Sequence, residues 1–61
     1  MLISEAELML QPYGVERIER VPSDTCPQLW RVTVNISDMV RAEYLYACSL
    51  ERIVWALTPE E

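Results

Sequence analysis

The segment LWRVTVNI, residues 29 to 36, decides the fold of this chain. Apolar and polar side chains alternate along it, and the larger apolar side chains on one side are Trp30, Val32, Val34 and Ile36. Strict alternation combined with β-branched residues is typical of a strand that buries one face. Because a two-stranded ribbon alone is only marginally stable in water, we expect a helix to lie across the apolar face of this strand.

Residues 15 to 21, VERIERV, are predicted to pair with this strand. Val15, Ile18 and Val21 recur every three residues, which fits neither strict alternation nor a full helical stripe. A glycine precedes the segment and the loop PSDTCPQ, residues 22 to 28, follows it, so we expect an antiparallel strand that can contain a bulge. The loop is either a recognition element or a slack tip, and the second interpretation is favoured.

A short helix is predicted at the N-terminal end, from ISEAEL, residues 3 to 8. Ser4 as N-cap and Glu7 three residues later form a capping box, and the flanking apolar residues are spaced as a hydrophobic staple. Pro12 disfavours the helical conformation of the residue before it, so this helix has to end early.

The covering helix is predicted from residues 37 to 58, where Ser37 or Asp38 begins it and Pro59 ends it. At 100° per residue, one apolar stripe of this helix faces the strand, and its members are Met39, Tyr46, Leu50, Ile53 and Leu57. Glu43 falls within the stripe and is expected to reach its margin or to pair with an arginine from a strand.

A second apolar stripe lies beside the first on the same predicted helix. Its members are Val40, Tyr44, Ala47, Cys48 and Trp55. A helix that is apolar over so much of its circumference is expected to be buried on two sides. Either the helix is continuous and the second stripe meets a partner, or it breaks near Cys48 and Ser49 and Ser49 caps a short final helix that folds back. The continuous helix is favoured, because the segment after Ser49 has no acidic residue at the third helical position.

Together these elements predict one α+β domain over residues 1 to 61. It consists of a short N-terminal helix, a two-stranded antiparallel sheet, and a C-terminal helix, continuous or broken near Ser49, packed across the sheet. A chain of this size buries only about 60% of its unfolded surface, so a metal, a disulfide or a partner usually adds stability. The chain has no His, and Cys26 and Cys48 are far apart without a C-x-x-C spacing. We therefore predict no metal, no cofactor and reduced thiols, which leaves a partner surface.

The composition argues against several classes of function. Without His, with scattered carboxylates and with a single Gly, the chain offers no catalytic residues and no phosphate-binding loop, so we predict that it is not an enzyme. Its net charge of −5, from five Arg and ten acidic residues, repels a phosphate backbone and argues against direct nucleic-acid binding. The sequence shows no signal-peptide pattern and no apolar run of about 20 residues, so a cytoplasmic location without membrane insertion is expected.

The leading hypothesis is a small non-enzymatic protein-binding module. It would be a regulator or inhibitor that docks on a larger protein or acts as a homodimer. The predicted interface residues have aromatic or apolar side chains: Val40, Tyr44, Cys48, Trp55 and Tyr13. One alternative is an acidic mimic of nucleic acid that inhibits a nucleic-acid-binding complex, as phage-encoded, anti-CRISPR-like proteins do. Another alternative is an accessory subunit with a scaffolding role.

Overall fold

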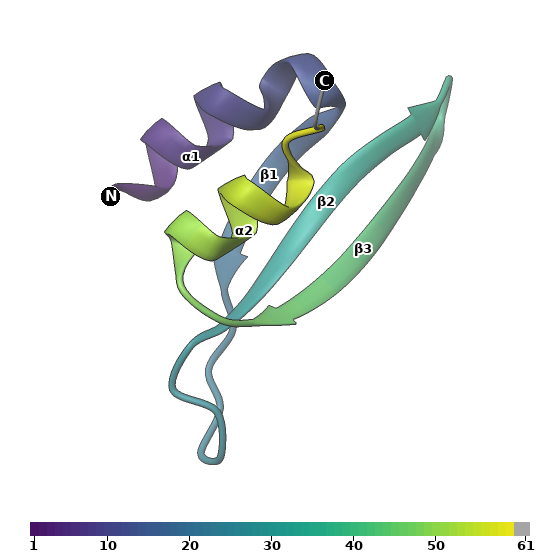
Figure 1. Cartoon of the computed structure of the whole chain (residues 1–61). Helices are drawn as coiled ribbons and strands as arrows, with labels where there is room; N and C mark the ends of the chain where they lie inside the picture. The colour runs from purple at the N-terminus through teal and green to yellow at the C-terminus, as the bar shows by residue number, and fades with distance from the viewer. Residues whose placement is uncertain (60–61) are drawn as a thin grey trace.

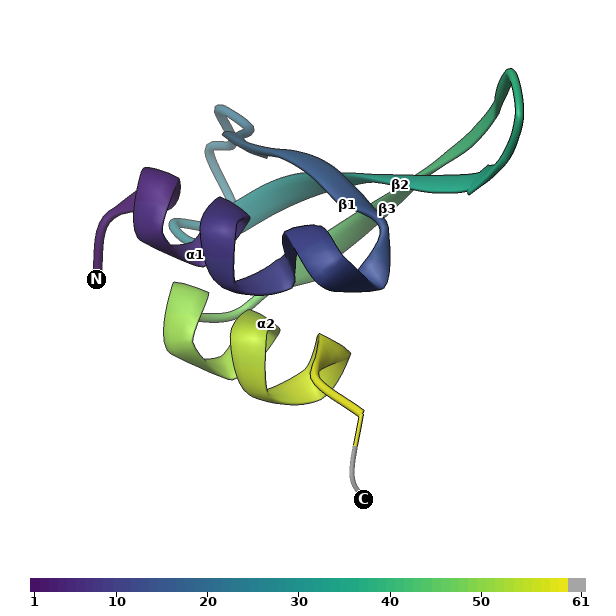
Figure 2. The ribbon, with the colours of Figure 1, turned by 90° about the horizontal axis from the view of Figure 1, so that it is seen from above.

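The computed structural model describes residues 1 to 59. In chain order its elements are the helix α1 (Ile3–Leu10), the 3-10 helix η1 (Gln11–Tyr13), the strands β1 (Val15–Arg20), β2 (Leu29–Ser37) and β3 (Val40–Ala47), and the helix α2 (Leu50–Leu57). The strands form an antiparallel sheet in the order β1-β2-β3, and both helices lie side by side on one face of it (Figure 1, Figure 2). The α+β class is confirmed, but the sheet has three strands where the sequence pattern predicts two.

The third strand replaces the first half of the predicted covering helix, and that part of the prediction is wrong. Residues 40 to 47, VRAEYLYA, pair with β2 in an antiparallel register that sets Tyr44 opposite Val32 and Tyr46 opposite Trp30. Aromatic and β-branched residues favour a strand when a neighbouring strand is present to pair with. Met39 turns the chain between β2 and β3, with a φ of 66° in the left-handed region.

The final helix begins where the less favoured interpretation of the sequence placed a break. Ser49 is the N-cap of α2, and its side-chain oxygen accepts a hydrogen bond from the backbone N–H of Arg52 at 3.3 Å. An N-cap serine satisfies an N–H group that has no partner within the helix. The C-terminal helix is therefore short, and the continuous helix predicted over residues 37 to 58 is wrong.

The helix α1 is present, but the predicted capping box is not its N-terminus. The backbone N–H of Leu2 donates to Oε1 of Glu5 at 2.9 Å, and Ser4 lies inside the helix. At the other end, Gly14 adopts a φ of 91°, which lets the chain leave η1 and enter β1 directly. Glu7 takes no part in capping the helix, and its side chain accepts a hydrogen bond from β1 instead.

A bulge explains the three-residue spacing of apolar side chains in β1. Val15 pairs with Val34 and Arg17 pairs with Thr33, so the register shifts at Glu16. The extra residue puts Val15 and Ile18 on the same face of the sheet, where both are buried.

The core lies between the helices and the β1–β2 half of the sheet. Its buried side chains are Ala6, Leu10, Val15, Ile18, Trp30, Val32, Leu50, Ile53 and Val54. The indole N–H of Trp30 donates to the backbone carbonyl of Cys48 at 2.8 Å, which ties β2 to the connection between β3 and α2. The predicted covered face of β2 is therefore confirmed at Trp30 and Val32, whereas Ile36 is exposed. No helix in the described part of the chain is long and apolar enough to cross a membrane.

Candidate functional site

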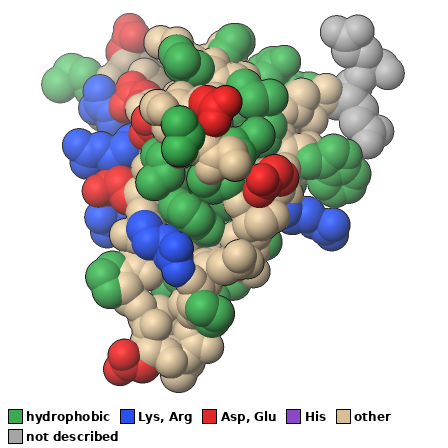
Figure 3. All heavy atoms as spheres, turned by 90° about the vertical axis from the view of Figure 1, so that its left-hand side faces the viewer, with side chains coloured by type: hydrophobic (Ala, Val, Ile, Leu, Met, Phe, Trp, Pro, Cys, Tyr) green, Lys and Arg blue, Asp and Glu red, His purple; other side chains and the backbone are tan. Residues whose placement is uncertain are grey.

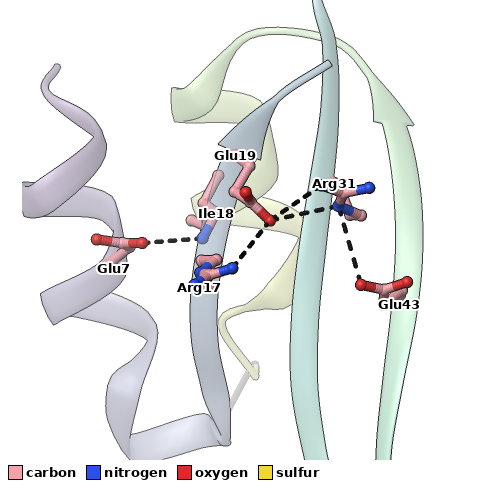
Figure 4. Close-up of polar contacts among 6 residues, drawn as sticks. All are labelled: Glu7, Arg17, Ile18, Glu19, Arg31 and Glu43. Atoms are coloured by element: carbon pink, nitrogen blue, oxygen red, sulfur yellow. Dashed lines mark hydrogen bonds and ion pairs between the residues drawn. The ribbon is translucent and has the colours of Figure 1, made fainter.

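The two edges of the sheet differ in whether a neighbouring element occupies them. At the β1 edge, the backbone N–H of Ile18 donates to Oε2 of Glu7 on α1 at 2.9 Å (Figure 4). Open strand edges can pair with further strands, and proteins commonly block them with a charged side chain or a packed helix. Here the carboxylate of Glu7, held by α1, takes the outward N–H of Ile18.

The hydrogen bonds at the two ends of β2 determine which backbone N–H and C=O groups of β3 point away from the sheet. Leu29 accepts from the N–H of Val21, and Asn35 donates its N–H to Gly14. Leu29 and Asn35 therefore face β1. In an antiparallel ladder the backbone groups of successive residues alternate in direction, so the even-numbered residues of β2 face β3.

This alternation leaves the outer edge of β3 open. The residues that pair with the even-numbered residues of β2 are Ala42, Tyr44 and Tyr46. The residues between and beside them direct their N–H and C=O groups away from the sheet, namely Arg41, Glu43, Leu45 and Ala47. Within residues 1 to 59, no backbone group of another element bonds to this row. We call this row the β3 edge.

Apolar side chains lie on both sides of the β3 edge. On the helix side of the sheet, Val40 and Tyr44 are 49% and 47% exposed, because the buried core lies over the β1–β2 half of the sheet. The hairpin of β2 and β3 also extends past the ends of both helices (Figure 1, Figure 2). On the opposite side Leu45 is 64% exposed, and Met39 at the hairpin turn is 95% exposed. A row of unpaired backbone groups with exposed apolar side chains beside it has the two features that strand addition uses.

The face of the sheet that the helices leave uncovered is lined by ion pairs. Arg31 lies 3.2 Å from Glu19 and 3.8 Å from Glu43, and Arg17 lies 3.5 Å from Glu19 (Figure 4). The prediction that Glu43 pairs with an arginine from a strand is confirmed. These partly exposed pairs each contribute little stability, but they keep this face hydrated and polar.

A second group of charges lies beside the bulge. Arg41 on β3 donates to Oε1 of Glu16 at 2.6 Å, and Asn35 donates to the other carboxylate oxygen at 3.2 Å. The hydrogen bond from Arg41, helped by Asn35, holds the pKa of Glu16 below its ordinary value. β1 and the outermost strand are therefore linked across β2 by a charged pair.

The structure separates the five residues predicted to form the interface. Val40 and Tyr44 share one side of β3, Trp55 is exposed on α2 with the guanidinium of Arg52 5.3 Å from the ring centroid, and Tyr13 is exposed in η1. Cys48 is half-buried against the core. The single helical stripe does not exist, and β3 brings together only the first two of these residues.

Some exposed apolar residues fall outside the predicted set. Leu45 lies on the β3 edge and Met39 at the hairpin turn. Leu8 and Met9 of α1 are also exposed, as is Leu2 immediately before this helix. Hydrophobic side chains gather in the middle of the view in Figure 3, with charged side chains around them. The alternation in VRAEYLYA is the sequence signal that could have revealed Leu45.

An open hollow of about 540 Å³ lies between α1 and the start of β1. Its acidic lining residues are Glu7 and Glu16, whose carboxylates already accept hydrogen bonds from Ile18 and Arg41. Ligand pockets usually present free polar groups that fix the ligand, and these two carboxylates are occupied. In the part of the chain that the structure describes, no cluster of three or more His, Cys, Asp or Glu is placed to hold a metal ion.

Comparison with known proteins finds no family model, curated protein or solved structure that matches this chain.

Proposed function

We propose that this chain is a small protein-binding module that uses the β3 edge as its docking strand. The observation that carries the proposal is the difference between the two edges: the carboxylate of Glu7 takes an outward N–H of β1, while within residues 1 to 59 no backbone group of another element bonds to the β3 edge. In strand addition, the backbone hydrogen bonds supply affinity and the alternating side chains supply specificity. The β3 edge offers both kinds of contact.

The side chains beside the edge support the same function. Tyr44 presents an aromatic ring at the middle of β3, half exposed on the helix side, and Leu45 is exposed on the other side. Tyrosine is enriched among the residues that dominate binding energy at protein interfaces. A partner strand laid along β3 would cover Tyr44 on one side and Leu45 on the other.

The alternative of an acidic nucleic-acid mimic draws less support from the charge distribution. Three acidic side chains of the sheet, Glu16, Glu19 and Glu43, lie next to Arg41 or Arg31. A mimic needs carboxylates that are free to meet a basic groove, and these are neutralised within the chain. The scaffold alternative uses the same docking surface, and no separate observation favours it.

The experiment that tests the proposal removes one backbone hydrogen-bond donor from the β3 edge and controls for the loss of the side chain. Leu45→Pro removes one outward N–H, and proline is tolerated in an edge strand where that N–H faces solvent. Leu45→Thr is the matched control, because it shortens the same side chain and keeps the N–H. Each form is immobilised and exposed to extract of the native host, and the retained proteins are identified by mass spectrometry.

We expect one or more proteins that are retained by the unchanged chain and by Leu45→Thr but lost with Leu45→Pro. Retention that is insensitive to proline at position 45, and is abolished instead by Leu8→Ser on α1, would place docking on the helix and contradict the proposal. Protection of the Trp30 indole N–H from hydrogen exchange verifies that each variant is folded, because this group is bonded to Cys48.

A further inference from the structure

From the geometry of the β3 edge, and resting on the proposed function, we infer that the partner is a second copy of this chain. Two β3 strands pair antiparallel about a two-fold axis that passes beside Tyr44, and the two sheets become one continuous six-stranded sheet. The axis is perpendicular to the sheet, so all four helices lie on the same face of the dimer.

The alternation of the backbone restricts how the two strands can align. The outward groups belong to the odd-numbered residues of β3, so each of them has to face an odd-numbered residue of the second copy. Pairing centred on Glu43 sets this carboxylate directly opposite its own copy, and like charges in that position are destabilising. That alignment is therefore disfavoured relative to one that separates the two carboxylates.

Among the remaining alignments, the one centred on Tyr44 pairs the longest stretch of strand. It joins residues 41 to 47 of one copy with residues 47 to 41 of the other, so all of the outward residues of the β3 edge are bonded. Glu43 then faces Leu45 of the second copy, and Arg41 faces Ala47. An alignment centred on Ala42 pairs only residues 40 to 44 and leaves Leu45 beside the hairpin turn.

Charge does not oppose this pairing. The chain as a whole carries −5, but the β3 edge has one Arg and one Glu. Both are already paired within the chain, Arg41 with Glu16 at 2.6 Å and Glu43 with Arg31 at 3.8 Å. Two copies can therefore approach through β3, where the local charge is neutral, without breaking an ion pair.

The tyrosines at the axis supply the central side-chain contact. The backbone N–H and C=O groups of Tyr44 point toward β2, so the two copies of Tyr44 cannot hydrogen-bond to each other. They would form a non-hydrogen-bonded pair, in which the Cα atoms lie about 4.5 Å apart. Aromatic pairs at such positions stabilise antiparallel strands. Pairing of this kind would cover the tyrosine that each monomer leaves 47% exposed.

The closed β1 edge explains why assembly would stop at two copies. A sheet with two open edges can add strands indefinitely, but a symmetric pair that uses the open edge of each copy leaves only the two β1 edges outside. Glu7 takes the outward N–H of Ile18 at those edges in both copies. The same asymmetry that identifies the docking strand therefore predicts a closed dimer.

The first test is the mass of the purified chain by sedimentation equilibrium over a wide concentration range. We expect a concentration-dependent dimer for the unchanged chain and for Leu45→Thr, and a folded monomer for Leu45→Pro. A chain that stays monomeric throughout would overturn the second-copy inference and leave the proposed function to be decided by the capture experiment. A dimer that survives Leu45→Pro would show that the copies meet elsewhere, and this also overturns the inference.

The second test changes Tyr44, the residue at the two-fold axis, and does not depend on a proline substitution. Tyr44→Lys and Tyr44→Glu each place two like charges opposite one another, so each variant alone should dimerise at least about tenfold more weakly than the unchanged chain. An equimolar mixture should regain dimers that contain one chain of each kind, because the charges are now opposite. Equally weak association of the mixture would show that Tyr44 does not face its own copy.

Discussion

Oε2 of Glu7 lies 2.9 Å from the backbone nitrogen of Ile18, and this hydrogen bond joins the first helix to the outer side of the first strand. The two residues are separated by 11 positions. The helix α1 therefore has two roles: its apolar residues Ala6 and Leu10 fill the core, and its Glu7 carboxylate blocks an N–H group at the sheet edge. In the described part of the chain, no backbone group of another element bonds to the β3 edge, and the functional proposals rest on this difference.

Removing the carboxylate of Glu7 should destabilise the fold. Glu7→Ala leaves the N–H of Ile18 without its charged acceptor in a partly buried position, and we expect a loss of about 1 to 2 kcal/mol in the free energy of unfolding. Glu7→Gln keeps an acceptor oxygen and should lose less. Urea denaturation measures both, and equal losses for the two variants would show that the bond contributes nothing specific.

The same substitution should also change how the chain assembles. If two copies pair through β3, Glu7→Ala uncovers the N–H of Ile18 and opens a second edge on each copy. Association then has no closing symmetry and should continue beyond two copies as the protein concentration rises. Sedimentation velocity would detect the larger species. The double variant Glu7→Ala, Leu45→Pro should no longer form the oligomers that require pairing through β3.

Gly14→Ala should destabilise the molecule more than a surface substitution does. Gly14 has a φ of 91°, and a Cβ at this position would lie 3.1 Å from the backbone oxygen of Asn35. Both the left-handed backbone and the close approach disfavour a side chain, so we expect a loss of about 1 to 3 kcal/mol. Gln28→Ala in the exposed loop is the control, and urea denaturation of both variants measures the difference. A loss no larger than that of the control would contradict the strained turn.

The strands β1 and β2 follow from sequence because their signals are local. Alternation places Trp30 and Val32 on one face, and the spacing of Val15 and Ile18 makes sense once a bulge is allowed at Glu16. In both segments the residues that fill the core are the residues that the pattern selects.

The strand β3 could not be identified in the same way, because its apolar residues fit two periods. Val40, Tyr44 and Cys48 recur at helical spacing, while Val40, Ala42, Tyr44 and Tyr46 also alternate. The turn before it gives no warning, since Met39 takes up a left-handed conformation that usually calls for glycine or asparagine. Pairing with β2 decides between the periods, and that is a property of the tertiary fold.

The candidate site was only partly accessible to sequence reasoning for the same reason. Val40 and Tyr44 are exposed as expected, although on a strand and not on a helix. The open backbone of β3 cannot be recognised before its pairing is known, and the role of Glu7 depends on a residue far away in sequence. Local spacing points instead to a capping box that the fold does not use.

The two serines near the helix starts should respond differently to alanine. Ser49 caps α2 by accepting from the N–H of Arg52, so Ser49→Ala should cost about 0.5 to 2 kcal/mol. Ser4 lies within α1 without a capping role, and Ser4→Ala should be neutral or slightly stabilising. Thermal unfolding of both variants distinguishes the observed caps from those that sequence spacing predicts, since a true capping box at Ser4 would reverse the order.

The ion pair between Glu16 and Arg41 should make the free energy of unfolding decrease as the pH falls. The guanidinium holds the pKa of Glu16 below its ordinary value of 4.5 in the folded chain. A carboxyl group whose pKa is lower folded than unfolded adds stability above the unfolded pKa, and this contribution disappears as the pH falls through the folded pKa.

Arg41→Gln should raise the pKa of Glu16 toward 4.5 and remove this part of the acid sensitivity. Carboxyl chemical shifts followed by NMR titration measure the pKa directly, with Arg52→Gln on α2 as the control. An unchanged titration of Glu16 in Arg41→Gln would show that the pair does not form in solution.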